Sequence, residues 1–182
     1  WLVARGWSRS GGTHHGRMLL AFRGIGCLTL AGRLRRVSFD GREDHYAALA
    51  KGRGAIMAVP PLGSCDMAVA FVGALGYPIA AVTERFPGSL NDAVVRTRSR
   101  FGLNVIMMGR SAVRSITQAL EANSIVALLC DLEQGRGVDV SFFGRRAVVP
   151  GGPAAIALKT GAALLPAYQY IESPGHHRVH VD

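Results

Sequence analysis

Acidic side chains are missing from the first 36 residues, which contain seven arginines and therefore carry a formal charge of +7. The remaining residues are nearly balanced at +2, so the net charge of +9 describes an N-terminal arm rather than the body of the protein. A nucleic acid is not predicted as a partner, because the arm contains no known binding motif and few aromatic side chains. We interpret residues 1–36 as a basic arm that is partly disordered or lies on a membrane surface.

Within this arm, residues 18–34 are apolar with interspersed arginines. Two interpretations fit this pattern: a helix on a membrane surface, and a helix that packs on the core and has a solvated basic end. Three glycines in the segment weaken any helix there. Both interpretations stay open at this point.

Cysteine is scarce, and long uncharged runs are rare. The three cysteines, at positions 27, 65 and 130, are too far apart for a zinc site or a disulfide framework, which favours reduced thiols in a cytosolic setting. The longest uncharged run, residues 67–83, contains two glycines and a proline, so we predict no transmembrane helix there. Only 18% of the residues are charged and 49% are hydrophobic, which excludes a wholly disordered chain.

From Val37 onward, short apolar segments alternate with segments of helical periodicity. Strands are expected at residues 55–59, 79–82, 103–107, 125–129, 163–170 and 178–181, and helices at 67–75, 89–100, 112–122 and 153–161. Ser89 and Ser111 are expected to cap two of these helices, and Gly161 to end the last one. The alternation predicts an α/β fold with a mostly parallel central sheet flanked by helices.

Three loops follow predicted strands at the carboxyl edge of the sheet, where α/β proteins place their binding sites. Asp66 stands in the first turn of the helix after the first loop, where it either has a chemical role or caps the helix. Gly109 and Arg110 precede a helix whose backbone N–H groups could bind a phosphate, although a solvated basic turn fits them too. Glu133 lies in a glycine-rich acidic loop that has no diagnostic spacing for a metal.

Seven short motifs follow one another along residues 52–166. They are Gly52-Arg-Gly-Ala-Ile, Leu62-Gly-Ser-Cys-Asp66, Thr83-Glu-Arg85, Asp131-Leu-Glu133, Val138-Asp-Val-Ser-Phe-Phe-Gly144, Pro150-Gly-Gly-Pro-Ala-Ala-Ile-Ala-Leu158 and Thr160-Gly-Ala-Ala-Leu-Leu-Pro166. In this order and spacing they resemble the lysophospholipid acyltransferase superfamily, in its branch of late lipid A acyltransferases and phosphatidylinositol mannoside acyltransferases. The resemblance covers about residues 37–182 and implies an acyltransferase-like α/β domain that is truncated at its C-terminus.

The resemblance implies transfer of a fatty acyl chain from acyl-CoA or acyl carrier protein to a hydroxyl of a glycolipid or phospholipid. It implies that the reaction uses the acyl donor alone, with no cofactor and no metal. The partners would be the donor, a lipid acceptor and a membrane surface, and the location would be the cytoplasmic side of the bacterial inner membrane, as a peripheral protein. The catalytically silent alternative is a domain that binds a lipid or a partner.

The family's signature is a histidine followed five residues later by an acid, in which the histidine removes the proton of the acceptor hydroxyl and the acid orients the imidazole. Asp66 matches the acid, but Pro61 stands where the histidine belongs, and proline cannot act as a base. Three explanations are open: a natural variant that has lost activity, a sequence error of one base, or substitution by another histidine. His45 is the nearest candidate, but we predict that it lies on the surface of its helix.

Other positions of the family pattern carry over more directly. Arg98 or Arg100 matches an arginine that meets a substrate phosphate in this branch, and Arg110 and the loop of Glu133 match motifs on the acceptor side. The resemblance therefore implies a catalytic role for Glu133 beside Asp66, and substrate binding by Gly109, Arg110 and one of the two arginines of the helix. The alternative for each arginine is a solvated helix face. The histidines at positions 176, 177 and 180 have no cysteine or acid partners in the pattern, so no metal site is predicted there.

Overall fold

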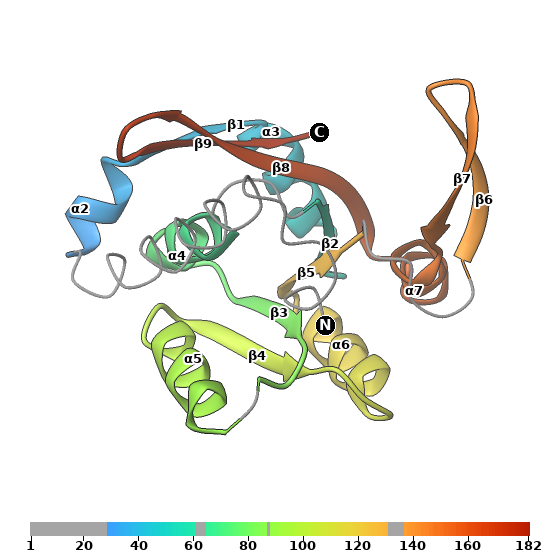
Figure 1. Ribbon diagram of the computed structural model, residues 1–182, viewed down its shortest axis with the longest axis horizontal. Coiled ribbons are helices and arrows are strands. Elements are labelled where there is room, and N and C mark those ends of the chain that lie inside the picture. The colour runs from blue at the N-terminus through green and yellow to red at the C-terminus, as the bar shows by residue number, and fades with distance from the viewer. Residues whose placement is uncertain (1–28, 61–64, 87, 131–136) are drawn as a thin grey trace.

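The computed structural model describes residues 29–60, 65–86, 88–130 and 137–182, and the statements below concern these residues. Their central element is a seven-stranded sheet with the order β1-β9-β8-β2-β5-β3-β4 (Figure 1). The strands are β1 (Val37–Asp40), β2 (Ala55–Val59), β3 (Ile79–Thr83), β4 (Leu103–Met107), β5 (Ile125–Leu129), β8 (Ala163–Ser173) and β9 (His176–Val181).

Neighbouring strands of this sheet are parallel except β8 and β9, which pair in antiparallel. Strand β8 is long because its two halves have different partners: residues 163–166 pair with β2, and residues 167–173 pair with β9. Five strands, β8, β2, β5, β3 and β4, therefore point the same way, and the carboxyl ends of β2, β5, β3 and β4 form one edge. The prediction of a mostly parallel α/β sheet is confirmed.

Six helices are described: α2 (Leu30–Leu34), α3 (Arg42–Ala50), α4 (Cys65–Ala74), α5 (Ser89–Ser99), α6 (Ala112–Glu121) and α7 (Gly152–Thr160). They cover both faces of the sheet because successive strand residues point to opposite sides. Met57 packs with Met67 and Phe71 of α4 on one face, whereas Ile56 packs with Ile116 of α6 and with partly buried residues of α7 on the other. The apolar runs of β2 and β5 are buried on both faces for this reason.

The predicted helix ends are confirmed in part. Gly161 adopts the left-handed conformation directly after α7, and Pro153 lies in the first turn of that helix, as expected. Ser111 occupies the N-cap position of α6 but makes no side-chain cap bond there. The prediction for Ser89 is wrong, because Gly88 takes the N-cap position and Ser89 is already helical.

Two elements differ from the expectations. Residues 138–144, expected as part of a loop, lie largely in the antiparallel hairpin formed by β6 (Gly137–Phe142) and β7 (Arg145–Pro150), which stands apart from the sheet beyond α7 (Figure 1). The prediction that His45 lies on the surface is also wrong. Its side chain is 1% exposed and packs edge-on against Tyr77 and Phe39, because the inner side of α3 faces the core.

The basic arm falls mostly outside the described residues. Its described part contains the short helix α2, with Leu34 packed against the core cluster that includes α4. The interpretation of residues 1–36 as a separate arm stays a prediction. Across the described segments, we find no helix that combines the length and the apolar character needed to cross a membrane.

Candidate active site at the carboxyl edge of the sheet

Asp66 and Arg98 meet at this edge. The Nε of Arg98 donates a hydrogen bond to Oδ1 of Asp66 at 2.7 Å, and both side chains are less than one-fifth exposed. The Nη1 of Arg98 donates a second bond, of 3.1 Å, to Oγ1 of Thr83. The three side chains come from the first turn of α4, the last turn of α5 and the last residue of β3, so they fix a carboxylate at the carboxyl end of the sheet.

The elements place these side chains for local reasons. An acid in the first turn of α4 is favoured because the N-terminal end of a helix carries partial positive charge. Thr83 ends a β-branched, apolar strand that is buried at its start and half-buried at its end. The carboxylate thus has the N-terminal end of a helix on one side and a guanidinium on the other, and both attract its negative charge.

The turn that contains Gly109 and Arg110 lies beside this group. The backbone N–H of Met108 donates to the carbonyl oxygen of Thr83 at 2.8 Å, which brings the start of the turn to the end of β3. Gly109 and Arg110 themselves are exposed and stand just before Ser111, the N-cap residue of α6. The structure therefore places this predicted phosphate site on the same edge as Asp66.

Arg100 does not join the group. It is exposed and forms the C-cap of α5, where its backbone N–H bonds to the last carbonyl oxygens of the helix. Residues two positions apart on a helix point to different sides, so Arg98 and Arg100 cannot both face Asp66. Of the two arginines proposed from the sequence, Arg98 is the one that reaches the carboxyl edge with its side chain half-buried.

Pro61 and Glu133 lie outside the described residues. Pro61 stands two positions after Val59, the last residue of β2, and Asp66 stands five positions after Pro61. The role predicted for Glu133 stays a prediction. Thr83 belongs to one of the seven motifs, but the resemblance implies no role for it. Its position as the last residue of β3 is the signal that could have identified it.

The described histidines offer no base beside Asp66. His45 packs 4.7 Å from the ring of Tyr77, which precedes β3, so it lies toward the amino edge of the sheet, opposite Asp66. His176 and His180 of β9 share one face, where they contact Ser38 and Asp182 respectively, and the buried His177 points to the other face. Within the described segments, no group of three metal-ligating side chains is present.

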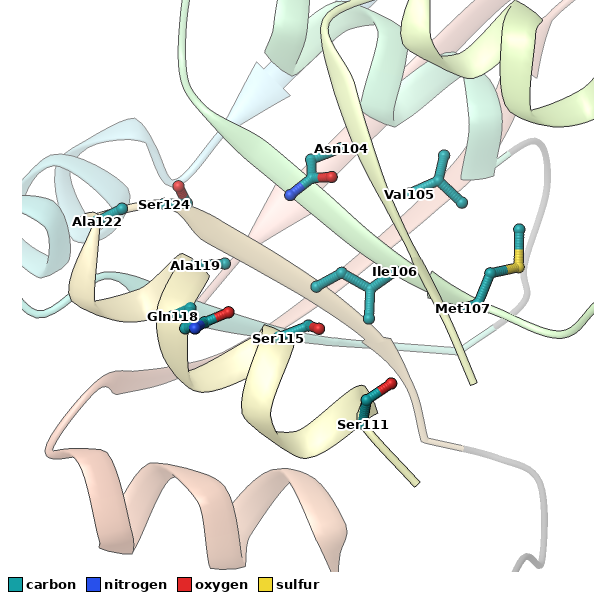
Figure 2. Close-up of a pocket in the computed structure, with 10 residues that line it drawn as sticks. All are labelled: Asn104, Val105, Ile106, Met107, Ser111, Ser115, Gln118, Ala119, Ala122 and Ser124. Atoms are coloured by element: carbon teal, nitrogen blue, oxygen red, sulfur yellow. The ribbon is translucent and has the colours of Figure 1, made fainter. Parts of the chain in front are cut away.

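A separate pocket of about 420 Å³ lies between β4 and α6 (Figure 2). Polar side chains of α6, Ser115 and Gln118, line one wall, and residues of the edge strand β4, including Asn104 and Ile106, line the other. Asp66, Thr83 and Arg98 do not line this pocket. It approaches the candidate site only at Met107 and Ser111, where β4 ends and α6 begins.

A comparison with known protein families matches residues 30–181 to the bacterial lipid A biosynthesis acyltransferases. The chain belongs to this family. The match includes every described strand of the sheet and the segments on both sides of Pro61. The resemblance given by the seven motifs is therefore confirmed at the level of the family.

Two curated relatives are phosphatidylinositol mannoside acyltransferases. The protein from Mycobacterium tuberculosis is 37% identical over 152 residues, which cover 80% of this chain and 48% of the relative. The protein from Mycolicibacterium smegmatis is 36% identical over 138 residues, which cover 72% of this chain and 45% of the relative. The chain thus spans about half the length of the curated relatives it matches.

Proposed function

We propose that this chain is the sheet domain of an acyltransferase that moves a fatty acyl group from a thioester to a hydroxyl of a glycolipid or phospholipid. The observation that carries the proposal is the half-buried Asp66, held by Arg98 at the carboxyl edge of a sheet of this family. The names of the relatives support a phosphatidylinositol mannoside as the acceptor type. The donor would be acyl-CoA or acyl carrier protein, at the cytoplasmic side of the inner membrane.

The residues present account for part of the chemistry. Arg98 occupies Oδ1 of Asp66 and thereby fixes the plane of the carboxylate, so that Oδ2 can accept a hydrogen bond from an imidazole N–H. Backbone N–H groups at the start of α6, with Arg110, are suited to an anionic substrate group. Acceptor activation needs a base five residues before Asp66, and Pro61 does not provide one.

A second candidate is a catalytically silent domain that binds a lipid or a partner. Pro61 favours this alternative, because a proline lacks the titratable group on which acyl transfer in this family depends. The fold and the Asp66–Arg98 pair would then preserve a binding site without turnover.

The two candidates are separated by measuring release of free CoA from a long-chain acyl-CoA, with phosphatidylinositol mannoside as acceptor, for this chain and for Pro61→His. Activity in the histidine variant alone supports an acyltransferase that has lost its base. Activity in both would mean that another group serves as the base. Inactivity of both, with binding of the glycolipid retained, supports the silent domain.

A further inference from the structure

The β6–β7 hairpin ends in two adjacent phenylalanines that point into solvent. Phe142 is 61% exposed and Phe143 is 91% exposed, and their rings contact each other edge-on with centroids 4.7 Å apart. Figure 1 shows that the turn is the part of the hairpin farthest from α7. The described chain therefore presents a compact aromatic tip at the end of a projecting arm.

The backbone of the turn would suit another residue better than phenylalanine. Phe143 has a φ of 50° and Gly144 a φ of 74°, the pattern of a two-residue type I′ turn, in which asparagine or glycine is preferred at the first position. A bulky side chain with positive φ is strained. Because Phe143 is almost fully exposed, the folded chain gains little packing in exchange. Strain of this kind at an exposed aromatic indicates a partner outside the described residues.

The hairpin is also amphipathic. One face carries apolar side chains, and these are Val138, Val140, Phe142, Ala147 and Val149. The other face carries the ion pair of Arg146 with Asp139, whose two bonds are both 2.8 Å. Arg145 stands across the strand pair from Phe142 and is exposed. Aromatic rings with an adjacent arginine fit the interface of an anionic bilayer, where rings enter the headgroup layer and a guanidinium meets lipid phosphate.

The place of the hairpin in the fold connects it with the candidate site. β7 leads directly into α7, which returns to the start of β8, and that start pairs with the start of β2. The beginning of α7, and with it the base of the hairpin, therefore lies toward the carboxyl edge of the sheet, where Asp66 and Arg98 meet.

We propose that the tip formed by Phe142, Phe143 and Arg145 docks the protein on an anionic lipid bilayer. The aromatic rings supply an apolar contact that does not depend on salt, and Arg145 adds an attraction to anionic headgroups. The proposal adds a membrane-docking element to the proposed function, and it rests on that function for the purpose of the docking, which is to bring a lipid acceptor to the site. The docking itself can be measured without any turnover.

The test is flotation of the whole chain with vesicles of phosphatidylcholine containing 30% phosphatidylglycerol (about one lipid in three, enough for a clear surface charge). Phe143→Asn keeps the type I′ turn and removes the ring, and Phe142→Thr keeps a strand-compatible residue. The measurement is made in roughly 0.5 M salt, where attraction of the basic arm to lipid is screened. Each variant is expected to lower the vesicle partition coefficient about tenfold.

Leu158→Asn is the matched control, because Leu158 is 88% exposed on α7 but lies off the tip. It should bind vesicles within about twofold of the parent, since the tip is intact. The proposal is overturned if Phe143→Asn binds as the parent does, or if Leu158→Asn loses as much binding. It is also overturned if the parent is a dimer without lipid and Phe143→Asn is a monomer, because a second copy would then cover the tip.

Acyl transfer is assayed on the same samples so that the two proposals fail separately. Loss of vesicle binding in Phe143→Asn, together with absence of acyl transfer in every variant including Pro61→His, would contradict the proposed function and support the docking tip. Acyl transfer by Pro61→His, together with unchanged vesicle binding in Phe143→Asn, would support the proposed function and contradict the docking tip.

Discussion

The guanidinium of Arg98 holds the carboxylate of Asp66 through a 2.7 Å bond between Nε and Oδ1, although the two residues are 32 positions apart. The bond ties the last turn of α5 to the first turn of α4, and Thr83 anchors the same guanidinium to β3. Because both charged side chains are less than one-fifth exposed, the pair is better shielded from water and salt than a surface ion pair. The orientation of the candidate catalytic acid therefore depends on a helix that does not contain it.

Replacing Arg98 with alanine should destabilise the fold. The substitution leaves a half-buried carboxylate without its charged partner, and we expect a loss of about 1–3 kcal/mol in the free energy of unfolding, measured by urea denaturation. Arg96→Ala is the matched control, because Arg96 is exposed on the same helix, and it should change stability by less than about 0.5 kcal/mol. Equal effects of the two substitutions would contradict the structural role of the Arg98–Asp66 bond.

Asp66 should matter for turnover only when a histidine is present. In the Pro61→His background, Asp66→Asn should reduce kcat at least about 100-fold, because an amide favours the wrong imidazole tautomer and does not stabilise its positive charge. Acyl transfer is followed by release of free CoA. An unchanged kcat would show that the acid does not orient the new base.

Two substitutions in the hairpin turn should change the stability of the fold in opposite directions. Phe143→Asn should stabilise the fold by roughly 0.5–1 kcal/mol, since asparagine tolerates the positive φ of this turn position. Gly144→Ala, at a φ of 74°, should destabilise it by about 1 kcal/mol. Thermal unfolding of the three proteins measures both changes. A lower melting temperature for Phe143→Asn would mean that the exposed ring supports the fold after all.

The sheet could be predicted from the sequence because its central strands are continuous apolar runs. Residues 55–59 and 125–129 have the predicted bounds, since burial on both faces leaves no polar position within β2 and β5 to obscure the pattern. The edge strand β4 also has its predicted bounds, although it contains the exposed Asn104. The hairpin was missed because its exposed strands mix polar and apolar residues next to a glycine-rich loop. The alternation of Val138, Val140 and Phe142 was the available signal.

The sequence predicts individual residues of the candidate site, but it does not predict which of them are in contact. The place of Asp66 after a strand and the family resemblance predict it as a site residue, and the resemblance alone predicts Arg98. Their contact depends on how α4 and α5 cross the end of β3, which no local pattern encodes. His45 shows the same limit. Its neighbours in sequence, Asp44 and Tyr46, are exposed, and only the packing of α3 against Phe39 and Tyr77 buries it.

His45 should make the protein less stable in acid. Burial lowers the pKa of its imidazole below the ordinary value of 6.5, so below that pH the unfolded chain binds the proton more readily than the folded one. The stability is complete above pH 6.5 and is lost as the pH falls from 6.5 toward the lowered value. Urea midpoints should therefore fall between pH 7.5 and pH 5.5 (roughly the range over which a histidine titrates).

His45→Phe isolates this effect, because phenylalanine fills the aromatic surroundings without a proton to gain. The variant should show a smaller difference between the two midpoints. Burial also lowers the pKa of His177, so part of the acid sensitivity should remain. An identical pH dependence in parent and variant would exclude His45 as a contributor.

Gly41 should not tolerate a side chain. Its φ is 80°, and a Cβ atom built there would collide with the backbone carbonyl of Val181 in β9. We expect Gly41→Ala to cost about 3 kcal/mol or more, because neither backbone can move away cheaply. Gly52→Ala has a similar φ of 67° but open space, so it should cost only about 1 kcal/mol. Urea denaturation compares the two, and similar losses would contradict the close approach.

The pairing of β1 with β9 sets the order in which the sheet can be completed. Val37 lies beside His177, and Arg178 bonds to Asp40 across 138 residues of chain. During synthesis, β1 leaves the ribosome early and has no partner until β9 has followed it. Contacts of such long sequence separation form slowly. We therefore expect the flank formed by β1 and β9 to be the last part of the sheet to assemble, and any shortening of the chain that removes β9 would also leave β1 without its strand partner.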